Sequence, residues 1–295
     1  MSLKNVALIG ASGNLGPAIL SNLADASFNV TIISREGSAS TFPSNFKVVR
    51  ADFSSHDSLV AAFKGQDVVI AAVASHALDQ QPKIVDAAIA AGVKRFVPSE
   101  FGSNTIDPKL NELVPIFGPK LAAVDYLKSK EDAISWTAFI TGPFFDWGLK
   151  VGFFGIDGKT KTAKVVDGGK GRWSGTTLNT IGLTVVKSLQ NPELTKNQYV
   201  AVASFVTTAS DIITTAEKFS GEKWSITDDT STDELVKSGK EKLGKGDHSG
   251  VVDLLRAGAF GGHHLGDSST LGLWNEKLGL PKEDFEQTVK ASLGL

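Results

Sequence analysis

A glycine-rich turn close to the N-terminus constrains the fold of this chain more than any other feature. The apolar run Val6–Ile9 leads directly into the turn Gly10-Ala11-Ser12-Gly13-Asn14-Leu15-Gly16. In a strand–turn–helix unit, Gly10 permits the sharp turn, Gly13 lets the backbone approach a pyrophosphate, and Gly16 lets the helix pack closely on the sheet. The amides near Asn14 and Leu15 would face the phosphates from a helix N-terminus. We therefore predict a dinucleotide site in the first βαβ unit, with Ser12 beside it.

The first half of the chain alternates short apolar runs with helix-like segments. The expected strands are 6–9, 29–33, 47–50, 67–72, 95–97 and 136–140. The expected helices are 15–24, 58–63, 82–91 and 119–129. Because the strands are apolar on both faces, helices should cover both sides of a parallel sheet. We predict an α/β fold: a Rossmann-type, doubly wound parallel sheet.

Beyond about residue 150 the pattern becomes less regular. Helices are expected at 177–189 and 209–219 and a strand at 199–203, whereas Asp228–Gly250 is polar and is left open as a lid or a tether. We expect residues 1–150 to form an NAD(P)-binding Rossmann domain, completed by parts of 176–205. Residues 151–295 should form a smaller, interleaved α+β substrate-binding part.

The composition excludes several kinds of partner and site. With 30 basic and 32 acidic residues, the chain has no charge excess that would favour nucleic acid. It has no cysteine, which excludes disulfides and thiolate metal sites and fits a reducing compartment. No apolar stretch approaches the roughly 20 residues that span a bilayer, and the N-terminal run is too short for a secretory signal. We expect a cytoplasmic protein with no membrane partner, either a monomer or a homodimer.

The end of the second expected strand bears on which dinucleotide is bound. An NAD-preferring domain usually carries an acid there, which accepts from the ribose 2′-hydroxyl. Here Arg35 follows the strand, and its guanidinium suits the 2′-phosphate of NADPH. Lys47 is a weaker second cation, and Glu36, one residue too late to replace the acid, leaves NADH as the alternative.

Further cofactor contacts are expected at the ends of the next strands, because ligands lie beyond the carboxyl ends of such strands. Asp52 and Phe53 close the third strand and would flank the adenine, although Phe53 fits the core equally well. Ala74 and Ser75 close the fourth strand beside the nicotinamide ribose. His76 is interpreted as a polar loop residue.

A series of motifs follows the turn in a fixed order. They are Ser34-Arg35-Glu36, Ala51-Asp52-Phe53, His56-Asp57-Ser58-Leu59, the run 67–72, Val93–Gly102, Lys120, Ile134–Thr137 and Gly142-Pro143-Phe144. Over about the first 150 residues the chain resembles the NmrA-like, isoflavone reductase-like family of atypical short-chain dehydrogenases. That family includes phenylcoumaran benzylic ether reductases and pinoresinol–lariciresinol reductases, and the second half resembles it only loosely.

The resemblance implies an NADPH-dependent oxidoreductase that reduces a phenylpropanoid-like or quinone-like aromatic molecule. Lys120 matches the lysine that these reductases place beside the nicotinamide, where it would act as general acid or base or position ribose hydroxyls and a water. Ile116 stands where common short-chain dehydrogenases carry a tyrosine. Tyr126 and Lys130 match the usual Tyr-x-x-x-Lys pattern, but at the far end of the helix, so we interpret the match as coincidental.

Aromatic residues cluster in the sequence around the expected domain junction. The substrate walls are predicted from Phe101, Phe145, Trp147, Phe153, Phe154 and Phe260, and Phe144 is expected at both the cofactor and the substrate. Such clustering suits a planar aromatic ligand, and it is equally typical of a core. His263 and His264 lack a third ligand at metal spacing, so no metal is predicted.

Two functions stay open at this point. Lys120 and the aromatic cluster favour a reductase. The missing tyrosine favours a non-catalytic NAD(P)-sensing regulatory protein of NmrA type, since function resides in the site rather than in the fold.

Overall fold

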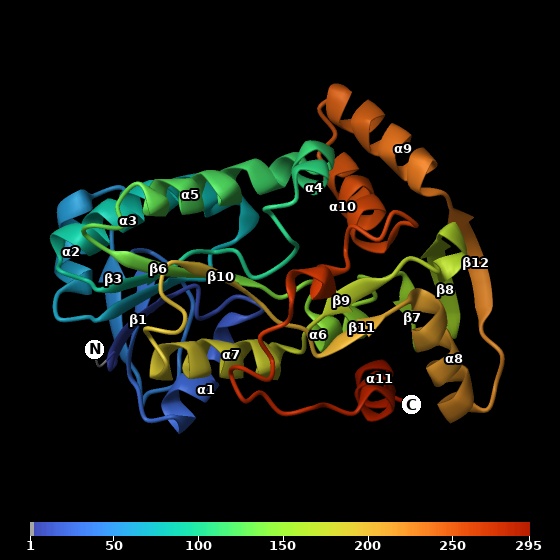
Figure 1. Ribbon diagram of the computed structural model, residues 1–295, viewed down its shortest axis with the longest axis horizontal. Helices are drawn as coiled ribbons and strands as arrows, with labels where there is room; N and C mark the ends of the chain where they lie inside the picture. Colours follow the sequence, from blue (N-terminus) through green and yellow to red (C-terminus); the bar gives the residue numbers. More distant parts are fainter. Residues whose placement is uncertain (1–2) are drawn as a thin grey trace.

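The computed structural model describes residues 3–295, and its larger part is a seven-stranded parallel sheet between two layers of helices (Figure 1). In spatial order the strands are β10 (Gln198–Ala201), β6 (Ser135–Ile140), β5 (Arg95–Val97), β4 (Val68–Ala71), β1 (Asn5–Ile9), β2 (Asn29–Arg35) and β3 (Lys47–Ala51). The strand order reverses between β1 and β4, where such folds bind dinucleotides. The prediction of a doubly wound parallel sheet is confirmed.

Helices cover both faces of this sheet, as expected from strands that are apolar on both sides (Figure 1). One layer holds α1 (Gly16–Asp25) and α7 (Leu178–Gln190); the other holds α2 (His56–Phe63), α3 (Gln81–Ala90) and α5 (Gly118–Lys128). α1 and α7 approach closely at Gly182, where a Cβ atom would lie 2.7 Å from the carbonyl oxygen of Ala18. Thus β10 is a strand of this sheet and α7 covers one of its faces, although both come from beyond residue 150. The division at residue 150 stays a prediction.

The rest of the chain forms a smaller part beside the carboxyl ends of the strands (Figure 1). Its strands are β7 (Ile156–Asp157), β8 (Thr162–Val166) and β12 (Ser225–Thr230) in one sheet and β9 (Trp173–Gly175) and β11 (Phe205–Thr207) in another. Its helices are α6 (Phe145–Lys150), α8 (Ala209–Ser220), α9 (Thr232–Gly244), α10 (Gly250–Phe260) and α11 (Phe285–Leu293). Between β5 and α5 lie α4 (Pro108–Leu113) and the 3-10 turn η2 (Pro115–Phe117).

The polar segment 228–250, left open as a lid or a tether, is the end of β12 followed by α9. Ser231 begins this helix through a reciprocal cap: its Oγ accepts from the amide of Glu234, and the Glu234 carboxylate accepts from the amide of Ser231. α9 packs on α10, where Lys242 pairs with Asp253 at 2.6 Å. Figure 1 shows the two helices as a hairpin at the edge of the molecule.

Within residues 3–295, no helix is both long and apolar enough to cross a membrane. Nor do three histidine, aspartate or glutamate side chains come together there as a possible metal site. His264 instead accepts a hydrogen bond at Nδ1 from the amide of Arg172.

Candidate active site

The glycine-rich turn between β1 and α1 is shaped by close approaches of the backbone. Gly10 has a φ of +86°, and a Cβ atom there would lie 2.1 Å from the carbonyl oxygen of Ala72. At Gly16 a Cβ atom would lie 2.3 Å from the carbonyl oxygen of Gly10, so this glycine accommodates the turn itself rather than the sheet. A Cβ at Gly13 would meet only that same carbonyl, at 3.3 Å. The side of Gly13 that a side chain would cover is therefore left open.

That open side belongs to a cleft of about 480 Å³ at the carboxyl ends of β1, β4 and β5. The cleft is lined by Gly13, Asn14, Leu15, Ala72, Val73, Ala74, Ser75, Leu78, Ser99, Glu100, Phe101, Lys120 and Phe144. Leu15 is the N-cap of α1 and offers no side-chain acceptor to the first amides of the helix. Free amides at a helix N-terminus bind phosphate groups. The residues present therefore fit the pyrophosphate of a dinucleotide.

A second cavity of about 220 Å³ adjoins the first. Its walls are Ser75, Phe101, Gly102, Ser103, Ile116, Phe117, Lys120, Gly142, Pro143, Phe144, Trp147, Phe153, Leu255 and Ala259. Most of these are apolar, and Lys120 is their one formally charged residue. The two cavities share Ser75, Phe101, Lys120 and Phe144. Lys120 therefore lies at the junction of the cofactor cleft and the apolar cavity.

Lys120 is partly buried and has a polar environment on one side. Its Nζ donates to the carbonyl oxygen of Glu100, and the Glu100 carboxylate accepts from Thr105. Burial lowers the pKa of Lys120, and the negative charge of Glu100 partly opposes this shift. Burial also raises the pKa of Glu100, against the effects of Lys120 and Thr105. Glu100 was not among the predicted site residues, although its position shortly after the buried strand β5 was a usable signal.

The residues expected at the adenosine end lie outside the lining of the cleft. Arg35 is exposed at the end of β2. The Asp52 carboxylate accepts from the amide and hydroxyl of Ser54, at 2.8 and 2.7 Å, and these bonds lower its pKa. Phe53 packs partly buried against the core beneath α2. Ser12 accepts a hydrogen bond from Ser40 at 3.3 Å. The side chain of His76 lies outside the described residues.

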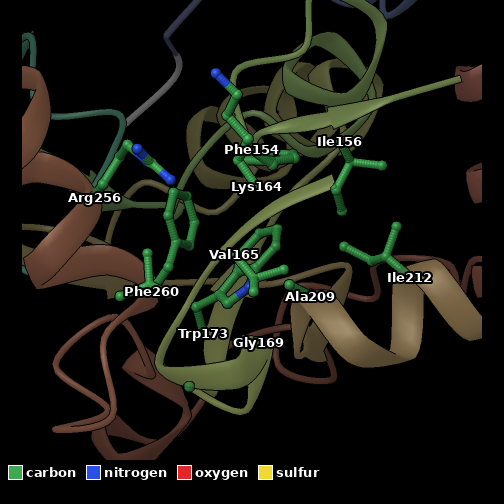
Figure 2. A pocket seen from close by; sticks show the side chains of 12 residues that line it. Phe154, Ile156, Lys164, Val165, Gly169, Trp173, Ala209, Ile212, Arg256 and Phe260 are labelled. Carbon is green, nitrogen blue, oxygen red and sulfur yellow. The ribbon is translucent and has the colours of Figure 1, made fainter. Parts of the chain in front are cut away.

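The predicted aromatic walls divide into two groups. Phe101, Phe144, Trp147 and Phe153 line the second cavity, with Phe144 also facing the cleft. Phe145, Phe154 and Phe260 do not line it and belong to the core of the smaller part. Figure 2 shows Phe154 and Phe260 with Trp173 around a space of about 10 Å³, room for about one water molecule.

The physical reason for this division is local. Phe144 precedes α6 and faces the cavities, whereas Phe145 is the first residue of that helix and is turned into the core. There the ring of Phe145 lies 4.9 Å from that of Phe205 and 5.8 Å from that of Trp173. We therefore leave Phe145, Phe154 and Phe260 out of the proposed substrate site.

Tyr126 and Ile116, the two residues weighed for a proton relay, lie in different places. The hydroxyl of Tyr126 donates to Asp86 on α3, and the ring packs against the core under α5. Ile116 lines the second cavity. The position expected for a relay hydroxyl is thus apolar, and Lys120 is the titratable side chain that both cavities share.

Comparison with known proteins places this chain in a family. The model of the NmrA-like family matches residues 2–233. The chain belongs to the NmrA-like family. Its relatives include the oxidoreductase aprR of Aspergillus flavus, 36% identical over 301 residues that cover 99% of each chain. The bifunctional pinoresinol-lariciresinol reductase 2 of Thuja plicata is 34% identical over 188 residues, 59% of each chain.

Several solved structures share the fold over the full length. The leucoanthocyanidin reductase–NADPH complex of Vitis vinifera superposes with a TM-score of 0.77 at 19% identity, covering 99% of this chain and 100% of that one. At this identity the likeness is one of fold. Together with the full-length relative named an oxidoreductase, these findings identify this NmrA-like protein as an oxidoreductase.

Proposed function

We propose that this protein is an NADPH-dependent reductase that transfers a hydride to an aromatic small molecule held in the apolar cavity. One observation carries the proposal: Lys120, with a lowered pKa, lies where the cofactor cleft meets an apolar cavity. The relative from Thuja plicata is named for the reduction of pinoresinol and lariciresinol, and the Vitis vinifera structure holds NADPH. Both names support a reductase of this class.

The cleft supplies the contacts that the cofactor needs. The amides at Asn14 and Leu15 would hold the pyrophosphate, and Arg35 would meet the 2′-phosphate beyond the cleft. Ala74, Ser75 and Phe144 would then flank the nicotinamide half, next to Lys120. When bound, the cofactor supplies the hydride.

Lys120 would supply the proton that accompanies the reduction. Its ammonium group donates to the Glu100 carbonyl, which fixes Nζ at the junction of the two cavities. From there a second N–H can reach an oxygen of the bound substrate. Phe101, Phe144 and Trp147 line the cavity beside this group, and a substrate bound against them would displace water and strengthen its electrostatic interactions.

A regulatory NAD(P) sensor is the second candidate, and Ile116 is the observation that favours it. Apolar Ile116 replaces a relay hydroxyl, and a sensor requires no relay. The second cavity favours the reductase, because a sensor requires only the cofactor cleft.

Titration with NADPH and NADH, followed by NADPH oxidation against quinones and benzylic ethers, tests the proposal. We expect tighter binding of NADPH and measurable turnover with at least one aromatic acceptor. Tight binding without turnover across the panel would favour the sensor. Tighter binding of NADH would contradict the role given to Arg35.

A further inference from the structure

A second arginine, Arg50, lies next to the strand end that carries Arg35. Arg50 is the fourth residue of β3 and is paired in register with Ser34, the residue before Arg35 on β2. Lys47, considered as the second cation from the sequence, is the first residue of β3. Four residue steps, roughly 13 Å, therefore separate Lys47 from the carboxyl end of β3 at Ala51, where ligands bind. Arg50 replaces Lys47 as the cation at this end of the sheet.

The guanidinium of Arg50 fixes the segment that connects β2 to β3. Nη1 donates to Ser34 Oγ at 2.8 Å and to the carbonyl oxygen of Ser38 at 3.0 Å, and Nη2 donates to the carbonyl oxygen of Ser40 at 2.7 Å. Its carbon Cζ lies 5.8 Å from the centre of the Phe42 ring. Four residues of the connection and of β2 are thus tied to one cation.

The fixed segment touches the glycine-rich turn. Ser40 donates to the hydroxyl of Ser12 at 3.3 Å. Ser12 lies between Gly10, which makes the turn out of β1, and Gly13, which lines the cofactor cleft. The Arg50-bound segment therefore lies beside the end of the turn that faces β2, where the ribose of the adenosine half is expected.

The charge of Arg50 is not neutralised by the partners it binds. All three acceptors are a hydroxyl or backbone carbonyls, and the described residues contain no ion pair of Arg50 or Arg35. The nearby Asp52 carboxylate accepts from Ser54 instead. Two arginines on adjacent strands without a carboxylate partner favour an anionic ligand of high charge.

We propose that Arg50 is a positioning residue for the 2′-phosphate of NADPH. It holds Ser38–Ser40 against the turn at the ribose end and adds a positive charge beside Arg35, and it thereby determines the preference for NADPH over NADH. The inference rests on the proposed binding of NADPH.

The test compares the dissociation constants of NADPH and NADH, measured by fluorescence, for wild type, Arg50→Ala, Arg50→Lys and Lys47→Ala. We expect Arg50→Ala to weaken NADPH binding about 10- to 100-fold, the range of a charge-assisted contact, and NADH binding less than about threefold. Arg50→Lys keeps the charge but not the planar guanidinium, so its affinity for NADPH should lie between those of wild type and Arg50→Ala. Lys47→Ala should show the same preference for NADPH over NADH as wild type.

The outcomes separate this inference from the function on which it rests. A wild type that does not prefer NADPH contradicts the proposed function before any variant is compared. If wild type prefers NADPH and Arg50→Ala keeps that preference, or weakens both cofactors equally, Arg50 has no role in selecting the phosphate. Full retention of the preference in Arg50→Lys would overturn the positioning role. Thermal unfolding of each variant checks that it is folded.

Discussion

The cofactor cleft and the apolar cavity share Lys120 but are built in different ways. The phosphate-binding end of the cleft is shaped by the backbone of one stretch, Gly10–Gly16, although the rest of the lining comes from residues between Ala72 and Phe144. The cavity is formed by side chains from segments far apart, from Phe101 to Ala259. A site made from local backbone tolerates few sequences, whereas a site made from distant side chains can change one wall at a time. The cofactor is accordingly easier to infer than the substrate.

Replacement of Lys120, which both regions share, should have the largest effect. We expect Lys120→Ala to lower kcat about 10²- to 10⁴-fold, the usual contribution of a proton donor, and to leave NADPH binding nearly unchanged. Steady-state kinetics and cofactor titration measure the two effects. Lys128→Ala, at an exposed position of the same helix, is the control. Unchanged turnover in Lys120→Ala would remove this residue from the mechanism.

Gly10→Ala tests the claim that the cleft is made by backbone. The alanine would have to keep a left-handed backbone conformation, and its Cβ would meet the carbonyl oxygen of Ala72. The two effects together should lower the free energy of unfolding by about 2–5 kcal/mol. Gly65→Ala is the matched control, because Gly65 has a φ of +78° but a Cβ atom added there would meet nothing within 4 Å. It should cost only about 1–2 kcal/mol. Equal losses in urea unfolding would show that the contact with Ala72 has no effect.

Ala259→Leu tests whether the cavity alone selects the substrate. Ala259 lies on α10 and lines the cavity, so a larger side chain should lower kcat/KM for bulky aromatic acceptors about tenfold. NADPH binding should not change. Val252→Leu, on the exposed side of α10, is the control and should behave as wild type. A parallel loss of NADPH affinity would contradict the separation of the two regions.

Glu100→Gln gives the smallest effect and concerns the boundary between the regions. Because burial raises the pKa of Glu100, the folded protein binds more protons than the unfolded chain between the ordinary and the raised pKa. The Glu100 contribution to stability is therefore present at low pH and is lost as pH rises through the raised pKa, by up to about 1.4 kcal/mol per pH unit. In urea unfolding between pH 4 and 8, the free energy of unfolding should decline less with rising pH for Glu100→Gln than for wild type. An identical decline would show that Glu100 does not titrate in this range.

Much of the sheet is predictable because local patterns determine it. The apolar residues of β1 and β4 are buried on both faces, and a run of this kind admits few other structures. The helix α9 was also predictable from the sequence, since Ser231 and Glu234 have the spacing of a capping box. Its polar composition concealed this signal.

The walls of the cavity could not be predicted in the same way. Phe144 and Phe145 are adjacent and chemically identical, yet one faces the cavities and the other is buried in the core. The difference depends on where α6 begins and on its contacts with distant residues such as Trp173 and Phe205. A cluster of aromatic residues in a sequence does not reveal which of its members contact a ligand.

The four residues shared by the two cavities have a consequence for the order of events in a catalytic cycle. A dinucleotide in the cleft would itself become a wall of the second cavity, since Ser75, Phe101, Lys120 and Phe144 border both spaces. The two ligands would then strengthen each other's binding by the same factor. An acceptor would therefore bind more tightly after the dinucleotide than before it.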